Sequence, residues 1–408
     1  TRHNLMLKNL SIKVIIFGFI FTFFSSFGQS FFLGLFNESI RNELDITHGQ
    51  FGSIYASATL LSSFILIWVG KKIDDINISK FAFLVILLLS FSCFFFSQIS
   101  SISILFIAIF LMRFSGQGMM SHTATTTVSR YFTKSRGKAL STIWFGLSTA
   151  EFILPVLMIF LLSLYNWKFV WISISIIVLL ILPLTSFLLV RNLDLDSREI
   201  EDRINKKSTD IKNWKRKEVI KDYRFYIICA NMLAMPWIAT GTFVYQSFIL
   251  TSKNWGPYII AQSFMVYSIL SVITLIISGI LIDKFTSRKL IIFMNIPLLT
   301  SVFVIIYFNH PITAFVFLGL IGISNGLANV LGSSTWAEIY GVKYIGSIKA
   351  LTTALMVFAT AFGTALFGIL IDKGFTIENI AIISAIYISI SLISLYFIRD
   401  RLNPVLSN

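Results

Sequence analysis

The stretch GILIDKFTSRK, Gly279–Lys289, follows one long apolar segment and precedes another. The first half of the chain carries a counterpart, GKKIDDINISK, Gly70–Lys80, whose leading glycine and first aspartate each stand 209 residues earlier. A second pair of segments, KALST at 138–142 and KALTT at 349–353, repeats at a spacing of 211 residues. Two matches at nearly one spacing indicate that the chain consists of two related halves.

Long apolar segments recur through both halves. Hydrophobic residues make up 56% of the chain and charged residues only 13%, which excludes an ordinary soluble domain. The first segment is too long for the apolar region of a signal peptide, so we expect it to be retained. Because an apolar helix of about 20 residues crosses a bilayer, we predict an all-α membrane protein with two pseudo-symmetric bundles of six helices, at approximately 14–36, 51–69, 81–99, 102–128, 139–163, 168–190, 223–250, 257–281, 289–308, 312–336, 347–371 and 378–397.

Positive charge is distributed unevenly between the segments that connect these spans. With the N-terminus placed inside, all but five of the 33 lysines and arginines fall in cytoplasmic segments. This excess predicts a multi-pass protein of the cytoplasmic (inner) membrane with both termini in the cytoplasm. The net charge of +14 therefore reflects topology and does not require a nucleic-acid partner. The exceptions are four outer residues and one residue within a span: Arg41, Lys168, Lys253, Lys373 and Arg113.

One long polar segment separates the two halves. We predict an N-terminal bundle at 1–190, a cytoplasmic linker at 191–222 and a C-terminal bundle at 223–408. The linker mixes basic with acidic residues, and anionic lipid headgroups would attract its basic side chains. We expect the chain to act as a monomer surrounded by membrane lipids.

These motifs resemble the major facilitator superfamily over essentially the whole chain. The resemblance is carried by the loops at Gly70–Lys80 and Gly279–Lys289, by RGKAL at 136–140 and by the central linker. The first loop departs from the family pattern at Asn77 and Ile78, where the family has glycine and a basic residue. The stretch at 325–351 is similar to the oxalate/formate and monocarboxylate porter branch. The resemblance implies a transporter that works by alternating access, with helices 1, 4, 7 and 10 lining a central cavity.

Two aspartates in the repeated loops, Asp74 and Asp283, are candidates for a gate. The family fold implies that each lies near the start of a helix from the opposite half. A carboxylate at a helix N-terminus gains roughly 0.3–2 kcal/mol, so the pair would latch the cytoplasmic side closed. Arg136 and Lys138, at the start of the fifth span, belong to the same predicted gate. The alternative is that these are ordinary loop charges.

Two charged residues fall near the middle of consecutive spans. Arg113 in the fourth span and Glu151 in the fifth are both about 16–18 Å deep at 1.5 Å per residue. A charge there costs at least about 2.5–3.5 kcal/mol without a partner or water, so we predict that they pair. Because the second half has Ile323 and Ala361 at the corresponding positions, we favour a substrate and proton site over a structural clamp.

Polar residues that could complete this site lie in the predicted cavity helices. With about 100° per residue in a helix, Gln117 lies on the same face as Arg113, whereas His122 lies opposite and is a second candidate for carrying a proton. Each amide could equally hold helices together. The remaining candidates for substrate binding are Gln29, Tyr245, Asn325 and Asn329.

A fixed guanidinium in a low-dielectric cavity prefers a carboxylate, so the predicted function is proton-coupled symport of a small organic anion. The alternative is proton-driven export of amphipathic compounds, for which the 41 phenylalanines could form an apolar cavity. Helix 5 lacks the GxxxGP pattern of such exporters. No catalytic motif is present, and both cysteines, Cys93 and Cys229, lie within spans, so we expect no enzyme activity, metal or cofactor.

Overall fold

The computed structural model describes residues 2–131, 136–191, 193, 211–341 and 344–407. Within these ranges, twelve helical segments are long and apolar enough to cross a membrane. The predicted fold class, an all-α membrane protein with twelve spans, is confirmed. The chain divides into two compact units, Thr1–Ile200 and Glu201–Asn408, and each contains six of the spans. Most of the predicted linker, 192 and 194–210, lies outside the described residues.

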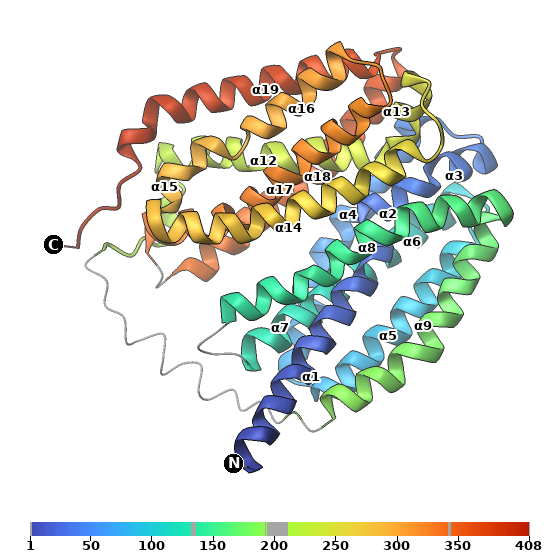
Figure 1. Ribbon diagram of the computed structural model, residues 1–408, viewed down its shortest axis with the longest axis horizontal. Helices are drawn as coiled ribbons and strands as arrows, with labels where there is room; N and C mark the ends of the chain where they lie inside the picture. Colours follow the sequence, from blue (N-terminus) through green and yellow to red (C-terminus); the bar gives the residue numbers. More distant parts are fainter. Residues whose placement is uncertain (1, 132–135, 192, 194–210, 342–343, 408) are drawn as a thin grey trace. The chain divides into compact units, whose positions relative to one another are not determined.

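The N-terminal unit is a bundle of helices (Figure 1), and several of its spans begin at polar capping residues. Thr47 and Gln50 form a reciprocal capping box at the start of the second span, which satisfies backbone N–H groups that the helix leaves free. The third, fourth and sixth spans begin at simpler caps, in which the side chains of Asn77, Ser101 and Asn166 each accept one backbone N–H. The helices are α1 (Arg2–Ser25), α2 (Ser30–Leu33), α3 (Asn37–Leu44), α4 (His48–Val69), α5 (Ile78–Ser97), α6 (Ile102–Met112), α7 (Ser121–Tyr131), α8 (Arg136–Leu164) and α9 (Trp167–Val190).

The C-terminal unit has the same plan. Its first span begins at Asp222, whose side chain accepts a backbone N–H from the first turn. The helices are α11 (Arg216–Val219), α12 (Tyr223–Val244), α13 (Gln246–Lys253), α14 (Ile259–Phe285), α15 (Ser287–Leu290), α16 (Ile296–Tyr307), α17 (Ile312–Tyr340), α18 (Ile345–Asp372) and α19 (Ile377–Ile398).

Helices pair in the same order within each unit. In the N-terminal unit α1 packs along α8, α4 against α6, and α5 against α9. In the C-terminal unit α12 packs along α18, α14 against α17, and α16 against α19. The first span therefore pairs with the fifth, the second with the fourth and the third with the sixth in both units. This arrangement is what a repeated six-helix module requires.

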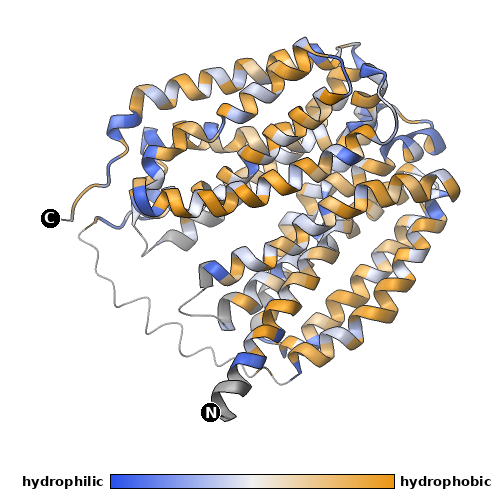
Figure 2. Ribbon diagram, viewed as in Figure 1, coloured by the Kyte–Doolittle hydropathy of each residue, from blue (hydrophilic) through white to orange (hydrophobic). Residues whose placement is uncertain are grey.

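Large apolar side chains cover the outer faces of several helices. Leu180 and Leu184 in α9 and Phe397 in α19 are among the most exposed, at 71%, 65% and 76%. Figure 2 shows apolar residues along the length of these helices and polar residues concentrated near helix ends. Such a surface is stable in lipid but not in water, and the chain is a multi-pass membrane protein.

Several of the described spans are not continuous α-helices; the ninth, for example, has the 3-10 helix η6 (Ile291–Phe293) between α15 and α16. The first predicted span, 14–36, is interrupted after α1 by the short 3-10 helix η1 (Ser26–Gly28) and by Gln29, which is extended at φ −85° and ψ 153°. The seventh span breaks at Tyr245 between α12 and α13. In the fourth span, the eight-residue π-helix η4 (Arg113–Met120) separates α6 from α7. The irregular segments of the first and fourth spans, η1 and η4, contact each other.

Candidate functional site

The first and fourth spans approach each other at two glycines. A Cβ atom on Gly28 would lie 2.2 Å from the Met112 carbonyl oxygen and 2.6 Å from the Gln117 backbone nitrogen. A Cβ atom on Gly116 would lie 2.7 Å from the backbone nitrogen of Gly28. Only glycine fits at either position, because it allows the two backbones to touch.

Irregular backbone marks this contact on both sides. A π-helix is rare and is frequently found at functional sites. Non-helical backbone inside a membrane span is tolerated only where protein buries it or where it lines a water-filled cavity. We therefore take the contact between the break at Gln29 and the π-helix that begins at Arg113 as the centre of the candidate site.

Arg113 lies at this centre and is only 4% exposed. Its Nη1 donates a hydrogen bond of 2.9 Å to the Gly28 carbonyl, and its guanidinium carbon lies 5.4 Å from the centre of the Tyr55 ring. Its Nε is buried without a hydrogen-bond partner. The predicted ion pair with Glu151 is wrong for this structure, because among the described residues no carboxylate lies within 4.0 Å of the guanidinium. The break in the first span supplies a carbonyl oxygen in its place.

Glu151 lies in α8, which packs along α1 and also contacts η1 and α2. Close packing fixes this helix, since a Cβ atom on Gly146 would lie 2.1 Å from the Phe19 carbonyl oxygen. The Glu151 side chain is 8% exposed, and it is the one buried carboxylate among the described residues of the N-terminal unit. Within that same set it has no hydrogen-bond or ion-pair partner. The helix that carries Arg113 and the helix that carries Glu151 therefore both contact the break in the first span.

Two side-chain amides lie near this centre. Gln29 is the extended residue of the break and Gln117 lies within the π-helix, and both are half-buried. Neither side-chain amide is hydrogen-bonded to another residue that the structure describes. An uncharged amide can donate to carboxylate oxygens, so both remain candidates for substrate contact.

His122 has a different environment. Its Nε2 lies 2.7 Å from the carbonyl oxygen of Gly70, at the end of the second span. The imidazole therefore joins the fourth span to the end of the second span. Its predicted role as a proton carrier stays a prediction.

Two of the three candidates in the C-terminal unit make contacts between helices. The Tyr245 hydroxyl donates to the Thr364 carbonyl at 2.8 Å, and its ring is fully buried. The Asn325 amide donates to the Ser271 hydroxyl at 2.8 Å. Asn329 is exposed. The first two side chains thus hold helices together in this structure, and the substrate-binding role of all three stays a prediction.

The predicted gate is only partly covered by the described residues. Asp283 is exposed near the end of α14, and Lys138 is exposed in the first turn of α8. The side chains of Asp74 and Arg136 lie outside the described residues. The latch between the halves stays a prediction.

Sequence reasoning missed Glu338, at the end of α17. Its carboxylate accepts the backbone N–H groups of Ser287 and Arg288 at 2.9 and 3.1 Å and forms an ion pair with the Arg288 side chain at 3.3 Å. A carboxylate therefore does bind free N–H groups at this loop, but it comes from the same unit. The acidic residue in WAEIYG, 336–341, was the available signal.

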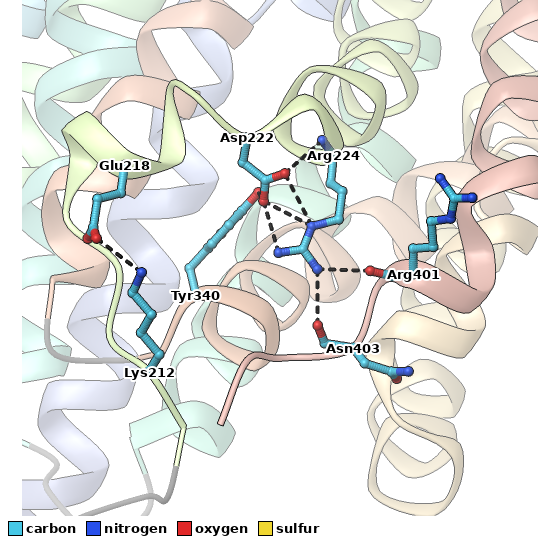
Figure 3. A network of polar contacts seen from close by, with 7 residues as sticks. All are labelled: Lys212, Glu218, Asp222, Arg224, Tyr340, Arg401 and Asn403. Carbon is cyan, nitrogen blue, oxygen red and sulfur yellow. Dashed lines mark hydrogen bonds and ion pairs between the residues drawn. The ribbon is translucent and has the colours of Figure 1, made fainter. Parts of the chain in front are cut away.

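Sequence reasoning also missed a buried ion pair at the start of the seventh span (Figure 3). The Arg224 guanidinium pairs with the Asp222 carboxylate at 2.9 Å, and its Nη1 donates to the carbonyls of Arg401 and Asn403 at 2.8 and 3.0 Å. The Tyr340 hydroxyl donates to the same carboxylate at 3.0 Å. We call these five residues the arginine clasp. It joins the end of the linker, α12, α17 and the C-terminal segment within one unit.

The linker residues beside the clasp are also ordered by polar contacts. The Glu218 carboxylate accepts the backbone N–H of Lys215 at 2.8 Å and pairs with Lys212 at 3.1 Å. These contacts, the backbone hydrogen bond first, hold the pKa of Glu218 below its ordinary value. The Lys212 N–H also donates to the carbonyl of Val405 at 2.8 Å. The last part of the linker therefore runs beside the C-terminal segment.

Comparisons with known families agree with this architecture. The model described as Major Facilitator Superfamily matches residues 18–364 and, in a second match, 226–407. A search of curated protein sequences gives no match.

Solved transporters share the fold. A bacterial homologue of the human lysosomal transporter Spinster, in an inward-facing and unoccupied conformation, is 13% identical, with a TM-score of 0.69 over 96% of this chain and 97% of that one. The nucleoside transporter NupG is 15% identical, with a TM-score of 0.64 over 97% of this chain and 99% of that one. At such low identity the likeness concerns the fold alone.

Proposed function

This chain belongs to the major facilitator superfamily and is a secondary transporter, not an enzyme; from that premise we propose that it moves a small organic anion together with a proton. The observation that carries the proposal is the buried guanidinium of Arg113, which no carboxylate among the described residues neutralises. A carbonyl oxygen and an aromatic ring stabilise it without cancelling its charge. The site therefore keeps a full positive charge for its cargo.

A carboxylate is the group that this cation fits best. Guanidinium and carboxylate form paired hydrogen bonds of matched geometry, and Arg113 still has an Nε without a partner. The amides of Gln29 and Gln117 would add donors around the same anion. Because there is one guanidinium, we propose monocarboxylates as the first class to test.

Proton coupling would come from Glu151. A buried carboxylate without a partner costs several kcal/mol, and binding a proton removes that cost. Charge balance also favours coupling, since an anion that crosses with one proton transfers no net charge. We propose that Glu151 holds the transported proton and that Arg113 holds the anion.

The distribution of lysine and arginine between the connecting segments supports the proposed membrane and orientation. Both termini would lie in the cytoplasm, with alternating access carrying substrate across the cytoplasmic membrane.

Transport assays in reconstituted vesicles test this function. Vesicles with an imposed pH gradient should accumulate a labelled monocarboxylate such as lactate faster when they contain wild-type protein than when they contain none. Glu151→Gln should abolish the accumulation that the gradient drives, while exchange of anion across the membrane persists. Undiminished accumulation by Glu151→Gln would reject its coupling role, and preferential uptake of neutral sugars would reject the anion.

A further inference from the structure

Tyr55 is buried against the proposed anion site. It lies in α4, is 1% exposed, and presents its ring to Arg113 with 5.4 Å between the guanidinium carbon and the ring centre. A cation within about 6 Å of an aromatic face is attracted by the negative potential above the ring. Neither the sequence motifs nor the family match assigns a role to this residue.

The hydroxyl end of Tyr55 contacts the first span. Its oxygen lies 2.8 Å from the Ser30 Oγ, which is the first residue of α2 after the break. Arg113 contacts the other side of the same break through the Gly28 carbonyl. Tyr55 thus touches both the cation and the irregular backbone that the cation binds.

We propose that Tyr55 is a positioning residue for anion binding, which holds the Arg113 guanidinium in place through its ring face and so keeps the site selective for anions. This inference rests on the proposed function. The ring and the hydroxyl have separate tasks: the ring holds the cation, and the hydroxyl holds α2.

The choice of an aromatic ring has a physical consequence. A carboxylate beside Arg113 would stabilise the buried cation, but the pair would be neutral and would have to separate before an anion could bind. The Tyr55 ring has a quadrupole and no net charge, so it stabilises the guanidinium and leaves its charge available. Without the ring, the guanidinium loses one of its two described contacts and would no longer be held in one orientation.

Three substitutions separate the tasks of ring and hydroxyl. Tyr55→Leu removes both, Tyr55→Phe removes only the hydroxyl, and Ser30→Ala removes the partner of that hydroxyl. Each purified variant is titrated with acetate, lactate and succinate, and dissociation constants are measured from thermal shifts. Tyr55→Met serves as a second ring-free variant if Tyr55→Leu fails to fold.

The expected results differ between the variants. Tyr55→Leu should weaken anion binding about thirtyfold, the factor that corresponds to a desolvated cation–π contact. Tyr55→Phe should stay within about twofold of wild type. Tyr55→Phe and Ser30→Ala should lower the ligand-free melting temperature equally, and their combination should lower it no further, because they remove the same hydrogen bond.

Two outcomes overturn the inference alone: ring-free variants that bind these acids as wild type does, or Tyr55→Phe that loses as much affinity as Tyr55→Leu. The proposed function fails separately if none of the three acids stabilises wild type, or if Arg113→Ala binds them unchanged, and the inference then falls with it.

Discussion

Loss of Arg224 should destabilise the C-terminal unit strongly, because the arginine clasp depends on its charge. The side chains of Arg224 and Asp222 are only 9% and 7% exposed. Arg224→Met would leave the Asp222 carboxylate buried without its cation and the Arg401 and Asn403 carbonyls without a donor. Breaking a buried pair by removal of one partner costs about 3–5 kcal/mol.

This loss of stability can be measured as a fall in the melting temperature. For a unit of roughly 150–250 residues, 1 kcal/mol shifts it by about 2–4 °C, so Arg224→Met should lower it by about 10 °C. Tryptophan fluorescence of the protein in detergent, heated at one fixed rate, gives the comparison. The matched control is Arg399→Met, because Arg399 forms an exposed pair with Asp400 at 4.0 Å and such pairs contribute about 0–1 kcal/mol.

The double substitution makes the test specific to the pair. Asp222→Asn combined with Arg224→Met should cost less than the sum of the two single changes. Once Asp222→Asn has removed the carboxylate, Arg224→Met no longer leaves a buried charge without its partner. If Arg224→Met melted within about 2 °C of the Arg399→Met control, or if the single effects simply added, the clasp would have no special role in stability.

Three further predictions concern other parts of the molecule. Gly146→Ala should lower the melting temperature by several degrees, since its Cβ would lie 2.1 Å from a carbonyl oxygen, whereas Gly279→Ala, with nothing within 4 Å, should leave it unchanged or raise it. Lys253→Met should destabilise far more than Lys168→Met in the same melting assay. The Lys253 side chain is fully buried among three oxygens and a carboxylate, whereas the side chains of the Lys168–Glu43 pair are 32% and 36% exposed; equal effects would contradict this. Because the pKa of Glu218 is lowered in the folded chain, its contribution should be present above pH 4.5 and lost as the pH falls through the folded value. Amide exchange protection in the linker should fall over that range, and Glu218→Gln should remove the pH dependence.

The fold was predictable because the membrane imposes a simple rule on sequence. A span at 168–190 was expected and Trp167–Val190 is observed, and 378–397 corresponds to Ile377–Arg401. Length and apolar content suffice for such helices, since each must cross the same thickness of hydrocarbon. The repeat at 70–80 and 279–289 indicated the family because recognising it needs only local sequence and no side-chain geometry.

The site was less predictable because its helices are irregular. Placing side chains at about 100° per residue assumes a regular helix, and this assumption fails in the π-helix that starts at Arg113. The cation consequently contacts a backbone carbonyl, which residue types alone do not reveal. One signal was present: QSFFL at Gln29–Leu33 and QSFIL at Gln246–Leu250 are similar, and both begin at a break in a span.

The central claim, that Arg113 offers an uncompensated charge to an anion, is tested most directly by comparing an acid with its neutral amide. Calorimetric titration of wild type, Arg113→Gln and the control Arg41→Gln, a half-buried arginine of α3, with lactate and with lactamide separates charge from shape. We expect lactate, and not lactamide, to bind wild type and Arg41→Gln, and neither compound to bind Arg113→Gln. Equal binding of lactamide and lactate to wild type, or unchanged lactate binding to Arg113→Gln, would contradict the claim.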